Sequence, residues 1–175
     1  MARISRRIAL TPEELDEMMA SSWNMRIATV GPGARINLTP LWFTWLNGKI
    51  YFRGRGQKIV NLRRNANATI VVDRNEQFVE LMGAMFQGTA KVLETVEDEQ
   101  ADPDFAAAQV AHARKYSGGH GENEAAPPRS EAPARTEAPR RTDGAARADT
   151  SRWVVFTPKQ LVTWDNKKIA GLRRG

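Results

Sequence analysis

The chain has 175 residues, a length that suits one domain with a hydrophobic core of its own. It contains no cysteine and only two histidines, so disulfides, thiolate nucleophiles and cysteine-ligated metals are excluded, and a histidine-built metal site is not expected. The sequence shows neither a signal-peptide pattern nor the roughly 18 consecutive apolar residues of a membrane span, and we expect a cytoplasmic protein.

The formal net charge of +6 is unevenly distributed along the chain. The positive excess lies in the C-terminal segment, residues 152–175, and in an acid-free run, residues 53–64, that includes Arg53, Arg55 and Lys58. A nucleic-acid-binding protein more often has a broad basic face with interleaved exposed aromatic residues. Two compact basic clusters instead favour a small polyanionic ligand, so nucleic acid is not expected as a partner.

The first predicted element is a helix over residues 12–20. Thr11 can cap its start, Pro12 suits the first helical position, and Glu14 completes a capping box. The apolar residues that follow fall on one face, which is typical of a short amphipathic helix packed on a core.

From residue 25 onwards the pattern becomes that of strands, with one short helix among them. We predict strands at residues 25–30, 35–45, 49–53, 68–73 and 76–93, and a helix at residues 57–64. Asn47 and Gly48 separate two of these strands and are typical of a two-residue hairpin with positive φ at both positions. Gly83 and Gly88 lie inside the last of the strands and indicate bulges or bends of the kind that barrels contain.

A second helical region is predicted over residues 97–116. Its apolar anchors are Phe105, Val110 and Tyr116, and His112 is expected to be an exposed helix residue.

Residues 117–151 contain no Val, Ile, Leu, Met, Phe, Trp or Tyr. Such a segment cannot bury enough apolar surface to offset the entropy of ordering it, so we predict a disordered insertion. The insertion divides a single domain into a main part, residues 1–116, and a closing segment, residues 152–175. We expect the closing segment to begin with a hairpin whose turn is at residues 157–159.

These elements give six or seven strands, mostly antiparallel to their neighbours, with two or three short flanking helices. That combination predicts an α+β, mainly β fold built around a β-barrel.

Four stretches of the chain carry a likeness to a known family. They are Met25-Arg-Ile-Ala-Thr-Val, Pro40-Leu-Trp-Phe, residues 50–65 with their Lys-x-x-Asn-Leu-Arg-Arg-Asn unit, and Gln87-Gly-Thr-Ala-Lys-Val. Their order resembles the pyridoxamine 5′-phosphate oxidase-like split β-barrel superfamily, and within it the group that uses a flavin or the deazaflavin coenzyme F420. The likeness covers about residues 10–95 and 152–165, and it implies an FMN-binding-like split β-barrel that forms a homodimer.

The resemblance implies that the loop after the third strand and the start of the next helix hold the phosphate of the cofactor. It assigns Arg53, Gly54, Arg55, Lys58 and Asn61 to cofactor binding. The first turn of a helix favours an anion there, because its backbone N–H groups are free and its dipole is positive at that end. Family members commonly have a serine or threonine near Arg53, which this loop lacks.

The resemblance also implies how the tricyclic ring of the cofactor is held. Pro40, Leu41 and Trp42 lie along its edge, where strand backbone can bond to the pyrimidine-like end, and Trp164 reaches the cofactor across the dimer interface. True pyridoxamine phosphate oxidases follow that tryptophan with an arginine–histidine motif. Here the run is Trp164-Asp-Asn-Lys, so vitamin B6 synthesis is not expected.

No Ser/His/Asp, Cys/His or paired-carboxylate arrangement is found, and we name no catalytic side chain and no metal ligand. A cofactor enzyme needs none, because the cofactor itself carries the hydride chemistry. The expected function is that of an F420-dependent oxidoreductase that transfers hydride to an unsaturated small molecule, with no membrane partner. FMN is the alternative cofactor. A second class also stays open, a split barrel that binds a flavin or haem without catalysis.

Overall fold

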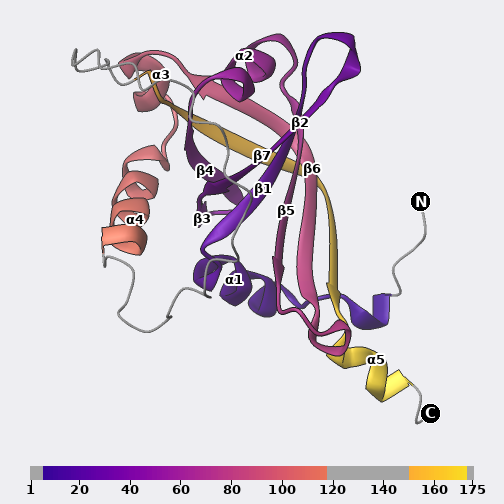
Figure 1. The fold of residues 1–175 in the computed structure, drawn as a ribbon. Helices are drawn as coiled ribbons and strands as arrows, with labels where there is room; N and C mark the ends of the chain where they lie inside the picture. Colours follow the sequence, from indigo (N-terminus) through magenta and orange to yellow (C-terminus); the bar gives the residue numbers. More distant parts are fainter. Residues whose placement is uncertain (1–5, 118–149, 173–175) are drawn as a thin grey trace, which may run out of the picture.

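Seven strands form one antiparallel sheet in the computed structural model, which describes residues 6–117 and 150–172 (Figure 1). In chain order the elements are α1 (Pro12–Ser21), β1 (Asn24–Val30), β2 (Ile36–Trp42), β3 (Thr44–Leu46), β4 (Lys49–Gly54), α2 (Gln57–Arg64), β5 (Asn67–Arg74), β6 (Met82–Leu93), α3 (Val96–Gln100), α4 (Phe105–Ser117), β7 (Arg152–Asp165) and α5 (Lys167–Leu172). Short 3₁₀ helices lie at Arg6–Ile8, Pro32–Ala34 and Phe78–Glu80.

The strand order is β2-β1-β5-β6-β7-β4-β3, and every pairing is antiparallel. The sheet is curled, because β2 at one edge also approaches β4 near the other edge. Helix α2 lies at one end of the curled sheet, α1 at the other, and α4 stands beside the β3–β4 hairpin (Figure 1). The split β-barrel prediction is therefore confirmed.

Two local features form as the sequence predicts, the capping box of α1 and the hairpin turn between β3 and β4. Around α1, the Thr11 hydroxyl accepts from the Glu14 N–H at 3.3 Å and the Glu14 carboxylate accepts from the Thr11 N–H at 2.7 Å. Between β3 and β4, Asn47 and Gly48 have φ values of 49° and 74°, as a two-residue hairpin requires. Each signal acts within a few residues, which is why the sequence alone reveals it.

The main core lies on the concave face of the sheet. Its largest fully buried side chains include Phe43, Phe52, Phe86, Phe156, Met18, Met19, Met25, Ile27, Ile50 and Ile70. Helix α1 closes one end of this core with its two methionines, and α2 closes the other with Ile59 and Leu62. A smaller cluster under α4 is formed by Tyr51, Leu93, Phe105, Ala108 and Val155.

The predicted closing hairpin at residues 153–164 is wrong. The segment is one continuous strand, β7, which pairs with β6 along its whole length and with β4 near its start. Pro158 is tolerated inside the strand because the ladder is irregular between Gln87 and Gly88 of β6. Gly88 is required there, since a Cβ would lie 2.2 Å from the Thr157 carbonyl oxygen.

Three other expected boundaries differ. The predicted strand 35–45 is interrupted at Phe43, and the strand expected from residue 76 begins at Met82 after a 3₁₀ turn. The helix 97–116 is broken at Asp102-Pro103 into α3 and α4, because the residue before proline avoids the helical region. Val110, an expected anchor, is 69% exposed.

The predicted insertion, residues 117–151, lies almost entirely outside the described residues. Its two ends are placed: α4 ends at Ser117, and β7 begins at Arg152 between β6 and β4. Among the described residues, no helix is both long enough and apolar enough to cross a membrane.

Candidate functional site

Two adjoining cavities lie between β2 and β4. The larger, about 630 Å³, is lined by Asn24, Pro40, Leu41, Trp42, Arg53 and His112. The smaller, about 330 Å³, is lined by Leu41, Arg53, Gly54, Arg55, Lys58 and Ser151. They share the lining residues Leu41 and Arg53, and the two together are called the β2–β4 groove.

The smaller cavity forms the basic end of the β2–β4 groove. Lys58 stands in the first turn of α2, and its Nζ donates to the Arg55 carbonyl oxygen at 3.0 Å. Burial, together with the neighbouring Arg55 charge, lowers the pKa of Lys58. Gly54 allows close packing, because a Cβ there would lie 3.1 Å from Ile59 and 3.3 Å from Lys58. None of the described residues lining this end is acidic.

Arg53 lies where the two cavities meet. Its guanidinium donates to the Ser151 hydroxyl at 2.5 Å and lies 6.0 Å from the centroid of the Trp153 ring. The side chain therefore reaches from β4 to the residues just before and within β7, which fixes one wall of the groove.

The larger cavity has an aromatic wall. Trp42 stacks on Tyr116 of α4 with ring centroids 4.5 Å apart and an interplanar angle of 5°. The Tyr116 hydroxyl accepts from the Phe43 N–H at 2.9 Å, and carbonyl oxygens of Trp23 and Phe43 lie 2.8 and 2.9 Å away to accept its proton. The tryptophan, 48% exposed, thus has a fixed flat ring on an edge strand, where alternate backbone N–H and C=O groups lack a partner strand.

His112 of α4 also lines the β2–β4 groove, so the expectation of an exposed residue is wrong. Its Nδ1 lies 3.0 Å from the Thr44 hydroxyl, and its ring packs between Tyr116 and Trp153, with centroids 4.7 and 5.1 Å away. Burial lowers the pKa of this imidazole, and the charges of Lys115 and Arg53 lower it further. A signal was present in the sequence: Phe105, Ala108, His112 and Tyr116 recur at helical spacing on one face of α4.

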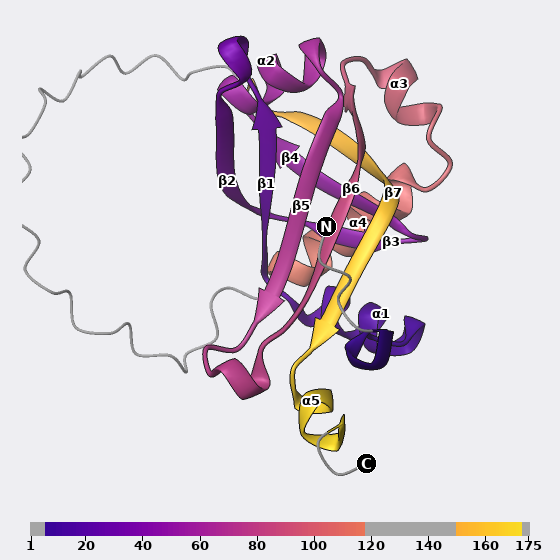
Figure 2. The same ribbon diagram turned by 90° about the vertical axis from the view of Figure 1, so that its right-hand side faces the viewer.

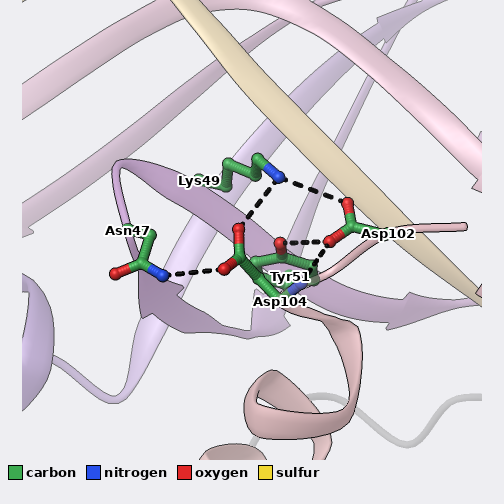
Figure 3. Close-up of polar contacts among 5 residues, drawn as sticks. All are labelled: Asn47, Lys49, Tyr51, Asp102 and Asp104. Carbon is green, nitrogen blue, oxygen red and sulfur yellow. Dashed lines mark hydrogen bonds and ion pairs between the residues drawn. The ribbon is translucent and has the colours of Figure 1, made fainter. Parts of the chain in front are cut away.

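At the other end of β4, a polar cluster fixes the start of α4 (Figure 3). Lys49 lies 3.0 Å from Asp104 and 3.4 Å from Asp102, Tyr51 donates to Asp102 at 3.0 Å, and Asn47 donates to Asp104 at 2.8 Å. The carboxylate of Asp104 raises the pKa of Lys49, while burial and Asp102 raise the pKa of Tyr51 to about 12. Every member is partnered, so this cluster positions α4 beside the groove rather than offering a binding site.

Comparison with known proteins identifies the family of this chain. A family model described as pyridoxamine 5′-phosphate oxidase matches residues 11–165. The chain belongs to the pyridoxamine 5′-phosphate oxidase family. This is a flavin-binding family whose members are usually oxidoreductases. A comparison with curated proteins gives no significant match.

Solved structures with the same fold are named for different ligands or for none. The conserved hypothetical protein Rv2991 from Mycobacterium tuberculosis is 21% identical, with 94% of this chain and 91% of that chain covered and a TM-score of 0.67. An F420 reductase is 17% identical, with 87% and 98% covered and a TM-score of 0.54. HutZ, the haem storage protein from Vibrio cholerae, is 14% identical, with 89% and 97% covered and a TM-score of 0.60. At these identities the likeness establishes the fold.

Of the residues that the family resemblance assigned to the cofactor, seven line the β2–β4 groove. They are Pro40, Leu41, Trp42, Arg53, Gly54, Arg55 and Lys58. The structure therefore places the expected ring-binding edge and the expected phosphate-binding loop beside the same pair of adjoining cavities.

The other two assigned residues lie elsewhere. Asn61 is 1% exposed, donates to the Thr29 hydroxyl at 3.1 Å and accepts from Gln57 at 2.8 Å. It borders a separate cavity, with Arg35 and Arg64, on another side of α2. Trp164 covers Gly83 near the C-terminal end of β7, whereas the groove adjoins the start of that strand. Within one chain, these two side chains do not line the groove.

Proposed function

We propose that this protein is a flavin- or deazaflavin-dependent oxidoreductase that holds its cofactor in the β2–β4 groove and passes hydride to an unsaturated small molecule. The observation that carries the proposal is the groove itself, with a fixed aromatic wall at one end and a basic end without acidic lining residues at the other. Coenzyme F420 and FMN both join a flat tricyclic ring to a phosphate, so both suit this groove. F420 is the preferred cofactor and FMN the alternative. The expected cytoplasmic location belongs to the same proposal.

The basic end of the groove suits the phosphate. Arg55 and Lys58 lie close enough for the arginine charge to lower the pKa of the lysine, and the start of α2 adds free backbone N–H groups and a positive dipole end. An anion bound there relieves the repulsion between the two cations and forms charge-assisted hydrogen bonds. These residues bind and orient the cofactor and take no part in bond making.

The aromatic end suits the ring. The cofactor, when bound, supplies the hydride-accepting and hydride-donating centre. The chain supplies an apolar wall from Leu41 and Trp42, an edge-strand backbone that can hydrogen-bond the ring, and a side wall from α4. Such a cavity orients the ring and excludes water from one side of it.

A second copy of the chain belongs to this proposal. The convex face of β2 carries a row of exposed apolar residues, with Ile36 65% and Leu38 63% exposed, and Trp42 ends the row at the groove. Ala28 on β1 and Val71 on β5 continue this face, beside the ion pair between Arg26 and Asp73, and no described helix covers it in Figure 2. An apolar face of this kind usually marks an interface. A twin seated on it covers the face and reaches the mouth of the groove.

The assembly is tested by light scattering. We expect twice the mass of a single chain, and we expect Leu38→Asp, which places a charge in the centre of the face, to give the single-chain mass. A wild-type protein that stays monomeric at high concentration contradicts the shared-site arrangement, although not the cofactor proposal itself.

A non-catalytic haem-binding function is the second candidate, and one observation favours it. His112 lines the groove, and imidazole is a usual axial ligand of haem iron. Titration with hemin separates the two functions, because ligation through His112 gives a shifted Soret band that His112→Phe abolishes.

The main experiment has two steps. Titration with FMN and with F420, followed by fluorescence, should give saturable binding at micromolar affinity or better. The reduced cofactor should then be oxidised by an α,β-unsaturated ketone faster when bound than when free, in single-turnover stopped flow. Absence of saturable binding of both cofactors refutes the proposal, and binding without acceleration points to a carrier.

A further inference from the structure

The imidazole of His112 lines the groove, and the proposed oxidoreductase function does not use it. Its Nδ1 is 3.0 Å from the hydroxyl of Thr44, a residue only 4% exposed. This is the single hydrogen bond of either side chain among the described residues. Two tautomers of His112 fit it: either Nδ1 carries the proton and donates to Thr44, or Thr44 donates to Nδ1 and the proton is on Nε2.

Counting donors and acceptors selects one of them. If Nδ1–H donated to Thr44, the buried hydroxyl would keep its own proton without an acceptor, which is strongly unfavourable. If Thr44 donates to Nδ1, the hydroxyl is satisfied and the imidazole proton sits on Nε2. Thr44 is thus a positioning residue that fixes His112 as an Nε2–H donor.

The surroundings keep this imidazole neutral and immobile. The titratable and charged groups around it are Lys115 and Tyr116 on its own helix and Arg53 on β4, and no carboxylate is among the described residues lining the groove. The pKa of His112 is lowered from its usual value, so near neutral pH the ring carries one proton. Contacts with the rings of Tyr116 and Trp153 leave little freedom to turn.

We propose that His112 is a ligand-binding residue, whose Nε2–H donates a hydrogen bond to a carbonyl oxygen of the ring system held in the β2–β4 groove. This inference rests on the proposed function, because it requires a ring with carbonyl acceptors beside Trp42. It also argues against haem, since a metal-ligating histidine needs a lone pair on the ligating nitrogen and normally donates its other N–H to an acceptor. Thr44 selects the opposite tautomer, in which Nε2 carries the proton and the lone pair of Nδ1 accepts from the threonine hydroxyl.

The test uses pairs of matched variants and the two probes FMN and F420. His112→Gln keeps an amide N–H near the Nε2 position, whereas His112→Asn keeps a polar group near Nδ1 and loses the donor at the Nε2 position. We expect His112→Asn to weaken probe binding about three- to tenfold, the value of one neutral hydrogen bond, and His112→Gln to stay within about twofold. Gln109→Asn, at an exposed position on the same helix, should bind like the wild type.

A second readout tests the tautomer directly. Nitrogen NMR of ¹⁵N-histidine-labelled protein in a His120→Gln background leaves one imidazole to observe. We expect a protonated Nε2 and an unprotonated Nδ1 in the free protein, an Nε2–H signal that shifts on addition of FMN or F420, and mixed tautomers in Thr44→Val but not in Thr44→Ser.

The outcomes are distinguishable. Wild-type binding with equal affinities for His112→Asn and His112→Gln overturns the inference and leaves the proposed function standing. An Nδ1–H tautomer in the free protein also overturns it. Failure of the wild type to bind either probe overturns both proposals.

Discussion

Basic side chains lie at both ends of strand β4, but their surroundings differ. At the hairpin end, Lys49 lies between two carboxylates, and each group in that cluster has a partner (Figure 3). At the other end, Arg55 and Lys58 stand side by side, with no acidic residue lining their cavity among the described residues. The first arrangement is complete within the chain, whereas we propose that a bound anion completes the second.

The difference shows what each set of charges is for. Paired charges with low exposure stabilise the chain that contains them, and breaking the pair is costly. Like charges held close together raise the free energy of the folded chain unless a ligand of opposite sign neutralises them. Changes at the hairpin end should therefore alter stability and leave binding unchanged, and changes at the groove end should do the reverse.

The largest effect is expected for Asp102→Ala at the hairpin end. The change removes the acceptor of the buried Tyr51 hydroxyl and one partner of Lys49, and we expect a loss of about 3 kcal/mol in the free energy of unfolding. Urea denaturation measures it. Affinity for FMN should change less than about twofold, because the contacts of Asp104 with Lys49 and Asn47 still hold the start of α4. As a control, Glu94→Ala breaks an exposed pair with Arg63 and should cost less than about 1 kcal/mol.

Lys58→Ala at the groove end should have the next largest effect, this time on binding. Loss of one charge-assisted contact with the phosphate, worth ~1.5–3 kcal/mol, weakens the dissociation constant for FMN by roughly 10- to 150-fold. The melting temperature should hardly change. Arg63→Ala is the matched control on the same helix, because its guanidinium is already bonded to Glu94 at 2.6 and 2.8 Å. A larger loss of affinity for Arg63→Ala than for Lys58→Ala would place the phosphate elsewhere.

A smaller effect is expected at Lys115, a cation that belongs to neither end. Its Nζ donates to the Phe43 carbonyl oxygen at 3.2 Å and lies 4.1 Å from the Phe43 ring centroid, and burial, with a contribution from Arg74, lowers the pKa of Lys115 to about 8. Between that pH and its usual pKa near 10.5, the unfolded chain binds a proton that the folded chain has released, so stability rises with pH.

The predicted rise is about 1 kcal/mol in the free energy of unfolding between roughly pH 8 and 9.5. Above about pH 10 Tyr51 and Tyr116 oppose this rise, because their pKa values are raised in the folded chain and their ionisation in the unfolded chain favours unfolding. Denaturation at a series of pH values measures the profile. Lys115→Met keeps the apolar stem and should flatten it. An unchanged profile in this variant would assign the rise to another group.

How far the sequence predicts this molecule follows from the range of each interaction. The capping box at Thr11 and the hairpin at Asn47-Gly48 are local, and both form as expected. Pro158 indicates a turn when only its neighbours in the sequence are considered. The residue that accommodates it, Gly88, lies far earlier in the chain and is paired with Pro158 only in the folded sheet. The break between α3 and α4 could be predicted from the sequence, because Pro103 alone disfavours the helical conformation at Asp102.

The site shows the same division. Residues 53–58 are contiguous, so their charge pattern alone indicates an anion site. His112 could not be assigned in that way, because its neighbours Thr44, Trp153 and Arg53 come from three other parts of the chain. The sequence likewise does not show that Asn61 is buried, because its side-chain amide donates to the hydroxyl of Thr29, which lies on strand β1.

The central claim is that the basic end of the β2–β4 groove binds the phosphate of a flavin-type cofactor. Calorimetric titration of the wild type and of Lys58→Ala, each with FMN and with riboflavin, tests it most directly, because riboflavin keeps the ring and lacks the phosphate. We predict that the wild type binds FMN at least about tenfold more tightly than riboflavin, and that Lys58→Ala loses most of this preference while its riboflavin affinity is unchanged. Equal losses for both ligands in Lys58→Ala, or a wild type that does not prefer FMN, would contradict the account.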